Sequence, residues 1–350
     1  MTWSAIVREA LARAGRRADQ AAQGLLPASF APVMAGGIVS RAAASLELRR
    51  LSDALLGMAV VAYAVLVVAS VWRLSRHRHR VVRDAADPAK VFGFFTFVAA
   101  SGVLATRLAG GRWAAVSVLL LASAVPVWLL LTRRAALTLR RVGAAGTVRA
   151  AEGSWFLCVV GLQSLVLAAS AQNDQGAWRA AELAGWSTGV LLYGVTTGVV
   201  AARLLRFGIS PRELSPPYWV AMGAGAISVL AGARFISYEP GAAAGWPTAA
   251  GAVAGVVTVV WTWAVGLVPV LVAAGVWRHG VRHVPLVSEP AWWTIVFPLG
   301  MFAVATETFG TAERADGLVA VGRALAWVAL AAWTLVGAAA LVRRSGRVRR

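Results

Sequence analysis

The chain has 350 residues, of which 59% are hydrophobic and 14% are charged, and its formal net charge at pH 7 is +19. An ordinary soluble domain is about 45–50% apolar, so this composition exceeds what a soluble core of the same length requires. It excludes a typical soluble fold and indicates an integral membrane protein.

The first segment, residues 1–26, lacks the apolar core of a signal peptide. Apolar side chains recur in it at helical spacing, with arginines between them. They are Trp3, Ile6, Val7, Ala10 and Leu11. This pattern predicts a short amphipathic helix that lies on the cytoplasmic surface of the membrane.

Ten apolar runs follow in the range 27–342. They cover residues 28–46, 53–73, 91–109, 113–132, 153–171, 182–204, 217–237, 248–276, 291–309 and 317–342. Each approaches or exceeds the ~20 residues that a helix needs to cross a hydrocarbon layer of ~30 Å. The runs do not alternate as the strands of a membrane β-barrel would. The sequence therefore predicts an all-α integral membrane protein with ten transmembrane helices.

Basic residues mark the sides of the membrane. With ten spans, 25 of the 34 Lys and Arg residues fall in the termini and the links on one side, and 9 fall on the other. The positive-inside rule then places both termini in the cytoplasm, including a basic tail at 343–350. This distribution explains the net charge through topology and anionic lipid, so nucleic acid is not expected as a partner.

The spans form a repeat. Odd-numbered runs begin every 62 to 74 residues, which predicts five copies of one helical hairpin. The even runs are bulky and bland, as helices that face lipid would be. The odd runs carry the small and polar residues, which favour an interior position. We therefore expect the odd helices inside, around a central pore, and the even helices outside; a solid bundle with tight packing is the alternative.

Each odd run also contains residues that weaken a helix near its middle. These are Gly37, Gly102, Gly161, Gly225, Pro298 and Gly300. Interrupted helical hydrogen bonds are tolerated inside a membrane where the helix lines a water-filled cavity. These residues are therefore interpreted as kinks in helices that line a pore, and kinks that only serve helix packing are the alternative. Phe297 precedes Pro298. A large apolar ring that projects into a narrow path can close it by volume and by dewetting, which makes Phe297 the candidate gate.

Charged residues near the ends of the odd runs are candidates for the outer mouth. Arg41, Arg107 and Arg234 could raise the local concentration of anions, although snorkelling to headgroups is the alternative. Glu307 at the same level would oppose anions. His279 and His283 have i, i+4 spacing but no accompanying ligand, so no metal is expected. No cofactor motif is found.

Several stretches resemble the tellurite-resistance/dicarboxylate transporter family, which includes the slow-type anion channels. They are FAPVMAGGIVSRAA, FGFFTFVAASGVLATRL, GSWFLCVVGLQS, PPYWVAMGAGAISVLAG and WWTIVFPLGMFAVAT, and the similarity runs from about 27 to 340. The resemblance implies ten helices in five hairpins, a phenylalanine of the ninth helix that occludes the pore, and a trimer. On the matching motif that residue is Phe297. Arg41 and Glu307 depart from the family pattern, since an apolar residue and a tyrosine are expected there.

The leading hypothesis is thus a channel or transporter in the cell membrane. It would move small anions, either inorganic anions or dicarboxylate and tellurite-type oxyanions. The partners would be those anions, membrane lipids and further copies of the chain. A membrane-embedded enzyme acting on lipid or quinone, and a non-conducting scaffold, are the alternatives.

Overall fold

A computed structural model describes residues 9, 15–16, 19–172, 178–211, 213–237, 246–285 and 290–348. Within these residues the chain is helical and contains no strand. The apolar face of the predicted N-terminal helix, from Trp3 to Leu11, lies outside the described residues.

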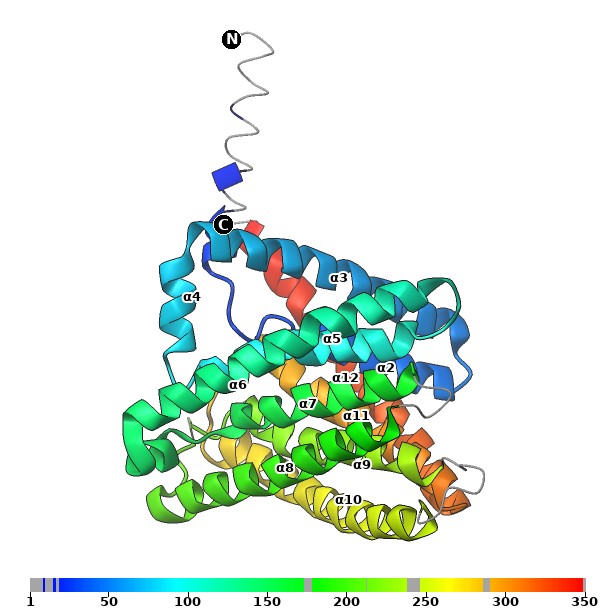
Figure 1. Ribbon diagram of the computed structural model, residues 1–350. Helices are drawn as coiled ribbons and strands as arrows, with labels where there is room; N and C mark the ends of the chain where they lie inside the picture. The colour runs from blue at the N-terminus through cyan, green and yellow to red at the C-terminus, as the bar shows by residue number, and fades with distance from the viewer. Residues whose placement is uncertain are drawn as a thin grey trace.

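Eleven α-helices make up the described chain (Figure 1). They are α2 (Ala31–Ser45), α3 (Arg49–Arg76), α4 (Arg78–Ala85), α5 (Phe95–Leu108), α6 (Ala114–Ala150), α7 (Leu157–Ala171), α8 (Arg179–Phe207), α9 (Val220–Ile236), α10 (Trp246–Val276), α11 (Trp293–Ala312) and α12 (Asp316–Val348). Short 3-10 helices precede five of them: η1 (Val91–Phe94), η2 (Gly111–Trp113), η3 (Gly153–Phe156), η4 (Pro216–Trp219) and η6 (Pro290–Trp292).

Nine helical segments in the described chain are long and apolar enough to cross a membrane. They correspond to nine of the ten predicted runs. The remaining run, predicted at 28–46, forms α2, which has only 15 residues. A helix of that length rises about 22 Å, less than the ~30 Å of the hydrocarbon core. The total of ten spans therefore stays a prediction.

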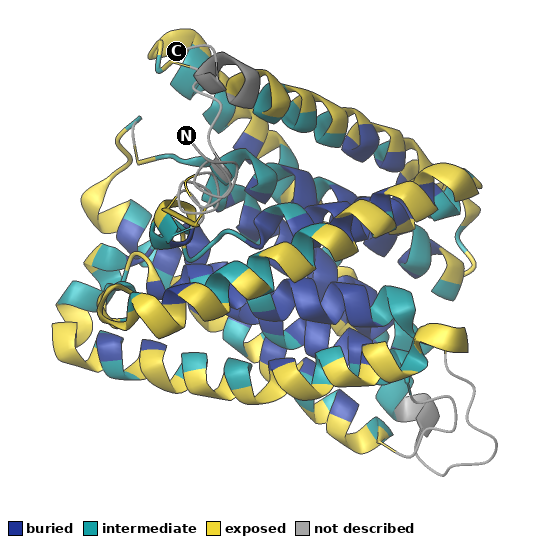
Figure 2. Cartoon of the chain, turned by 90° about the horizontal axis from the view of Figure 1, so that it is seen from above, coloured by how far each residue is buried: buried dark blue, intermediate teal, exposed yellow. Residues whose placement is uncertain are grey.

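Burial alternates along the chain. The segments that contain α5, α7, α9 and α11 are 67–78% buried within the protein, whereas those of α3, α6, α8, α10 and α12 are 11–28% buried. Most residues of α2 are also buried. Figure 2 shows the same contrast, with buried helices in the middle and exposed residues on the surrounding ones. The small and polar residues of the odd runs are thus the ones that other helices cover.

The buried helices contact one another in a closed ring. α2 contacts α5 and α11, α5 contacts α7, α7 contacts α9, and α9 contacts α11. Each of the five exposed helices packs on the buried helix that precedes it in the chain, so that α3 lies on α2 and α12 on α11. In Figure 1, α3 and α10 lie at opposite edges of the bundle, and α5, α7, α9 and α11 lie between them.

The four 3-10 turns that precede α5, α7, α9 and α11 gather at one end of this ring. η1 contacts η3, η3 contacts η4, and η4 contacts η6. At Gly153 a Cβ atom would lie only 2.4 Å from the backbone of Tyr218, so only glycine permits this approach. The N-terminal ends of α5, α7, α9 and α11 therefore lie together. Because the helices run the same way through the bundle, their C-terminal ends meet at the opposite end.

Two helix boundaries differ from the predicted ones. α6 continues to Ala150, beyond the run predicted at 113–132, and its backbone departs from helical geometry at Gly143 (φ 70°, ψ 177°). α12 continues through much of the predicted tail, to Val348. In both places polar, arginine-rich sequence extends an apolar helix, and hydropathy does not register such an extension.

An ion pair joins α3 to α4. The guanidinium of Arg73, which is buried, lies 2.6 Å from the carboxylate of Asp84, and Lys90 lies 3.2 Å from the same carboxylate. Burial tends to raise the pKa of Asp84, but the hydrogen bonds from Arg73 and Lys90 outweigh it and hold the pKa below its usual value. This pair holds α4 in place beside the 3-10 end of the ring.

Candidate functional site

A cavity opens at the end of the ring where the buried helices terminate. Its volume is about 260 Å³, and all five buried helices contribute to its wall. The lining residues are Gly37, Ile38 and Arg41 of α2, Val103, Thr106 and Arg107 of α5, Ser164 and Leu167 of α7, Leu230 and Arg234 of α9 with the following Ser237, and Met301, Val304 and Thr308 of α11. We call this space the arginine cavity.

Three guanidinium groups line the arginine cavity, and they are held differently. Arg107 is half-buried; its Nε donates to Ser40 Oγ at 3.1 Å and its Nη2 donates to Ser52 Oγ at 3.0 Å. These bonds tie α5 to α2 and α3. Among the described residues, no hydrogen bond or ion pair joins Arg41 or Arg234 to another side chain. Their charges therefore remain available to a ligand in the cavity.

The charge of the cavity opposes that of the helix ends. The C-terminal end of an α-helix carries a partial negative charge, so parallel buried helices bring several such ends to one place. The arginines at the ends of α2, α5 and α9 offset this charge. A concave, partly enclosed site lined by guanidinium groups concentrates anions from solution.

The part of the cavity wall that α11 contributes is mainly apolar. Met301, Val304 and Thr308 line the cavity from α11, and Phe297 lies four residues before Met301. Residues at spacings of three and four share one face of a helix, so Phe297 continues the same stripe one turn deeper. Its side chain is fully buried. The ring thus belongs to the packed interior of the bundle and does not face the lipid side.

Glu307 takes a different place from the one expected at the mouth. Its carboxylate lies 3.5 Å from the guanidinium of Arg323 on α12. A Cβ atom on Gly322 of α12 would come within 2.5 Å of the backbone nitrogen of Glu307, so the two helices are in close contact there. Glu307 therefore faces α12 and is not among the residues that line the arginine cavity.

The glycines of the odd runs lie mainly at helix contacts. Helical backbone continues through each of them. A Cβ atom on Gly102 would lie 2.7 Å from the backbone of Ser164, and one on Gly225 would lie 3.0 Å from the hydroxyl of Tyr193. At Gly161 the nearest atom belongs to Trp128 of α6. These positions allow close packing between helices.

Pro298 and Gly300 occupy similar contacts on α11. Pro298 packs against Gly223 of α9, where a Cβ would lie 2.9 Å from its ring. A Cβ atom on Gly300 would lie 3.0 Å from the side chain of Ile38 of α2. Gly37 is the only one of the predicted kink positions that lines the arginine cavity.

Several residues in and around the cavity could not be identified from the sequence. Ser40 and Ser52, which fix Arg107, lie on two helices, and Ser52 Oγ also donates to the carbonyl of Ser40 at 2.7 Å. Ser164 and Thr106 add hydroxyl groups to the wall. In the sequence, a hydroxyl residue precedes an arginine at Ser40–Arg41 and at Thr106–Arg107, which indicates a polar helix end. The hydrogen bonds of Arg107 to serines on two other helices cannot be derived from that pattern.

Comparison with known proteins identifies the family of the chain. The family model described as "Voltage-dependent anion channel" matches residues 24–341. Two uncharacterized membrane proteins of Mycobacterium tuberculosis, from strains CDC 1551 and H37Rv, are each 42% identical over 164 residues, which is 45% of this chain and 82% of theirs. The match of the family model covers nearly the whole bundle. The chain therefore belongs to the voltage-dependent anion channel family, the tellurite-resistance/dicarboxylate transporter family that its sequence resembles.

Proposed function

We propose that the chain is a channel or transporter for small anions, and that the path runs through the ring of buried helices with Phe297 as its gate. One observation carries this proposal: a single cavity is lined by all five buried helices, has three arginines in its wall, and lies one helical turn from Phe297. Family membership favours transport over the membrane-enzyme alternative.

The path would work by attraction followed by a barrier. Arg41 and Arg234 draw anions into the cavity. The side chains of Phe297, Met34 and Ile227 are fully buried. Together they would form an apolar layer below the cavity that neither water nor an ion could cross while it is packed. Movement of the Phe297 ring would open that layer. The gathered N-terminal ends of the buried helices, with their partial positive charge, would then receive the anion.

The substrate class follows from the chemistry of the wall. Guanidinium groups bind carboxylates and oxyanions through paired hydrogen bonds, so inorganic anions, dicarboxylates and tellurite-type oxyanions all suit the site. We place the 3-10 end in the cytoplasm, together with both termini, because the basic links lie there. The arginine cavity then faces outward across the cell membrane. A trimer with one path in each chain remains part of the proposal.

The proposal is tested by anion flux through Phe297→Ala in proteoliposomes. The matched control is Phe309→Ala: Phe309 is also buried on α11, but its ring packs against Trp261 of α10 at 6.1 Å, away from the cavity. Both changes cost a few kcal/mol of stability by removing a buried ring. We expect at least tenfold faster chloride and nitrate flux in Phe297→Ala alone. Equal flux in the two folded variants would rule out the gate.

A further inference from the structure

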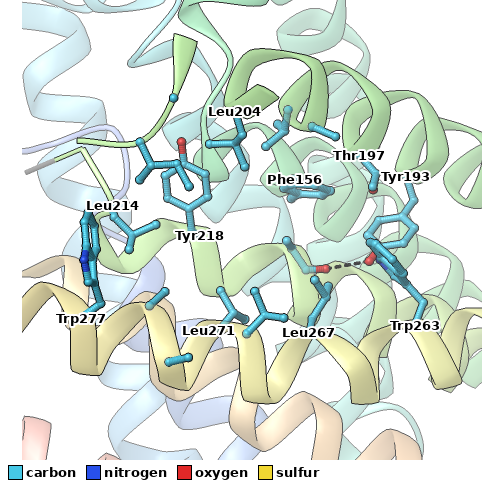
Figure 3. Close-up of a pocket in the computed structure, with 18 residues that line it drawn as sticks. Phe156, Tyr193, Thr197, Leu204, Leu214, Tyr218, Trp263, Leu267, Leu271 and Trp277 are labelled. Atoms are coloured by element: carbon cyan, nitrogen blue, oxygen red, sulfur yellow. Dashed lines mark hydrogen bonds between the residues drawn. The ribbon is translucent and has the colours of Figure 1, made fainter. Parts of the chain in front are cut away.

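An apolar groove separates the exposed helices α8 and α10 on the outside of the ring (Figure 3). Its volume is about 800 Å³, within the range of small-molecule sites. Among the described residues α8 and α10 make little direct contact with each other, although both pack on α9. Figure 3 shows Leu267 and Leu271 of α10 on one wall, and Trp263 and Trp277 at the two ends. We call this space the α8–α10 groove.

The floor of the groove belongs to the buried ring. Phe156 of η3 and Tyr218 of η4 lie across it from α10. Tyr193 of α8 lies at the Trp263 end of the groove (Figure 3) and donates its hydroxyl hydrogen to the carbonyl of Ala221, with 3.0 Å between the oxygens. This bond satisfies the hydroxyl group of Tyr193, so the surface of the groove that a ligand would contact is almost wholly apolar. A chain-like apolar ligand fits such a surface.

The groove lies between two helices of the membrane-crossing type that are mostly exposed. Alanine and valine residues in its walls, such as Ala201 and Val270, are open to the surroundings. The surroundings at this depth are the acyl chains of the bilayer.

Cationic side chains stand at the 3-10 end of the groove. Arg278 follows Trp277 in the π-helical turn that ends α10, and its Nη1 donates to the carbonyl of Leu214, a residue of the groove wall. The guanidinium of Arg282 lies 5.3 Å from the centre of the Trp277 ring. Neither arginine takes part in an ion pair between described residues.

A third arginine, Arg149, lies at the α8 side of the same end of the groove. The guanidinium of Arg149 lies 5.2 Å from the ring centre of Phe207, the residue before the stretch Gly208–Ile209 that lines the groove. Arg203, by contrast, is neutralised by Glu213 at 3.2 Å. The free positive charge at this end therefore comes from Arg149, Arg278 and Arg282. Basic groups between membrane helices on the cytoplasmic side bind anionic lipid headgroups.

We propose that the α8–α10 groove is a binding site for an anionic phospholipid of the bilayer, with an acyl chain along the groove and the phosphate on Arg149, Arg278 and Arg282. The apolar wall accounts for the chain, and the unpaired cations account for the preference for negative headgroups. Such a lipid touches η3 and η4, where the buried helices α7 and α9 begin. Its binding does not depend on the substrate of the arginine cavity.

Native mass spectrometry of the purified, delipidated chain tests the proposal. The protein is titrated with phosphatidylglycerol and, separately, with phosphatidylcholine of the same acyl chains. We expect one tightly held phosphatidylglycerol per chain, and at least fivefold weaker binding of phosphatidylcholine. Ala201→Trp fills the groove from α8 and should reduce phosphatidylglycerol binding at least fivefold. Ala331→Trp, on an exposed position of α12, is the matched control and should bind like the wild type.

The double variant Arg149→Gln with Arg282→Gln tests the headgroup site without filling the groove. Both arginines are exposed, so the fold should tolerate the change. We expect the preference for phosphatidylglycerol over phosphatidylcholine to disappear. Equal phosphatidylglycerol binding by Ala201→Trp and Ala331→Trp would overturn the proposal, as would an unchanged headgroup preference in the double variant. If Ala201→Trp alone dissociated an oligomer, the groove would be an interface with a second copy of the chain, and the lipid proposal would be wrong.

Discussion

Arg234 offers the clearest test of the arginine cavity. Its guanidinium lines the cavity, and no hydrogen bond to another described side chain fixes it. Arg107, in contrast, also holds helices together through Ser40 and Ser52. Its removal would change both the affinity for an anion and the stability of the fold, and the two effects could not be separated. Arg234→Gln removes one charge, keeps much of the volume, and should leave the fold intact. We expect it to weaken the binding of a transported anion.

The size of this effect follows from the dimensions of the cavity. A sphere of about 260 Å³ has a radius of about 4 Å, so an anion at its centre lies roughly 6 Å from a guanidinium charge in the wall, and Coulomb's law gives about 0.7 kcal/mol in water and about 2.8 kcal/mol at an effective dielectric constant of 20. The corresponding loss of affinity is about threefold to about a hundredfold. The site is partly open, so added salt should reduce the difference.

The assay is the concentration dependence of anion flux into proteoliposomes, measured in the Phe297→Ala background if the wild type is closed. Arg112→Gln is the matched control, because Arg112 follows the end of α5 and lies over the ring of Trp113, outside the cavity wall. Arg234→Gln should raise the half-saturating concentration within the range above, and Arg112→Gln should not. An equal half-saturating concentration in both variants would refute the role assigned to the cavity.

Two further predictions concern stability in detergent. Gly102→Ala should lower the midpoint of thermal unfolding, because its Cβ would lie 2.7 Å from the backbone of Ser164 and overpacking costs about 1–3 kcal/mol; Gly194→Ala, with no atom within 4 Å, should not lower it. Asp84→Asn should cost roughly 1.5–3 kcal/mol at pH 7 through the weakened bond to Arg73. The folded pKa of Asp84 is lowered, so its contribution is complete above the unfolded pKa of about 3.9 and is lost as the pH falls through the folded value. A stability difference between wild type and Asp84→Asn that stayed constant down to pH 2 would contradict this account.

The class of the protein and most of its spans could be derived from the chain alone. Hydropathy is a sum over consecutive residues, so it locates helices such as α7 and α9 well wherever they lie in the bundle. It failed at boundaries where arginine-rich sequence continues a helix, as in α6 beyond residue 132. The separation into bland and polar runs anticipated which segments other helices bury, because exposure to lipid selects for bulky apolar side chains on every face.

The partners of individual side chains depend on rotation about the helix axis and on the neighbouring helix. Glu307 and Arg234 both lie near the end of an odd run, yet Arg234 lines the cavity while Glu307 contacts Arg323 on α12. Successive side chains of an α-helix point about 100° apart, so a shift of one residue changes which neighbour a side chain meets. The sequence alone does not say which side of each helix faces the cavity. The same limit applied to Gly161, which packs against Trp128 of α6.

The sequence by itself therefore determined that this is a helical membrane protein, which segments are apolar enough to cross the bilayer, and the family to which it belongs. It did so because each of these properties is local, or is a pattern along one dimension. Only the tertiary structure decided that Arg41, Arg107 and Arg234 line one cavity, that Ser40 and Ser52 fix the second of them, and that a groove separates α8 from α10. Those properties arise where residues far apart in the chain meet, and helix packing sets which of them do.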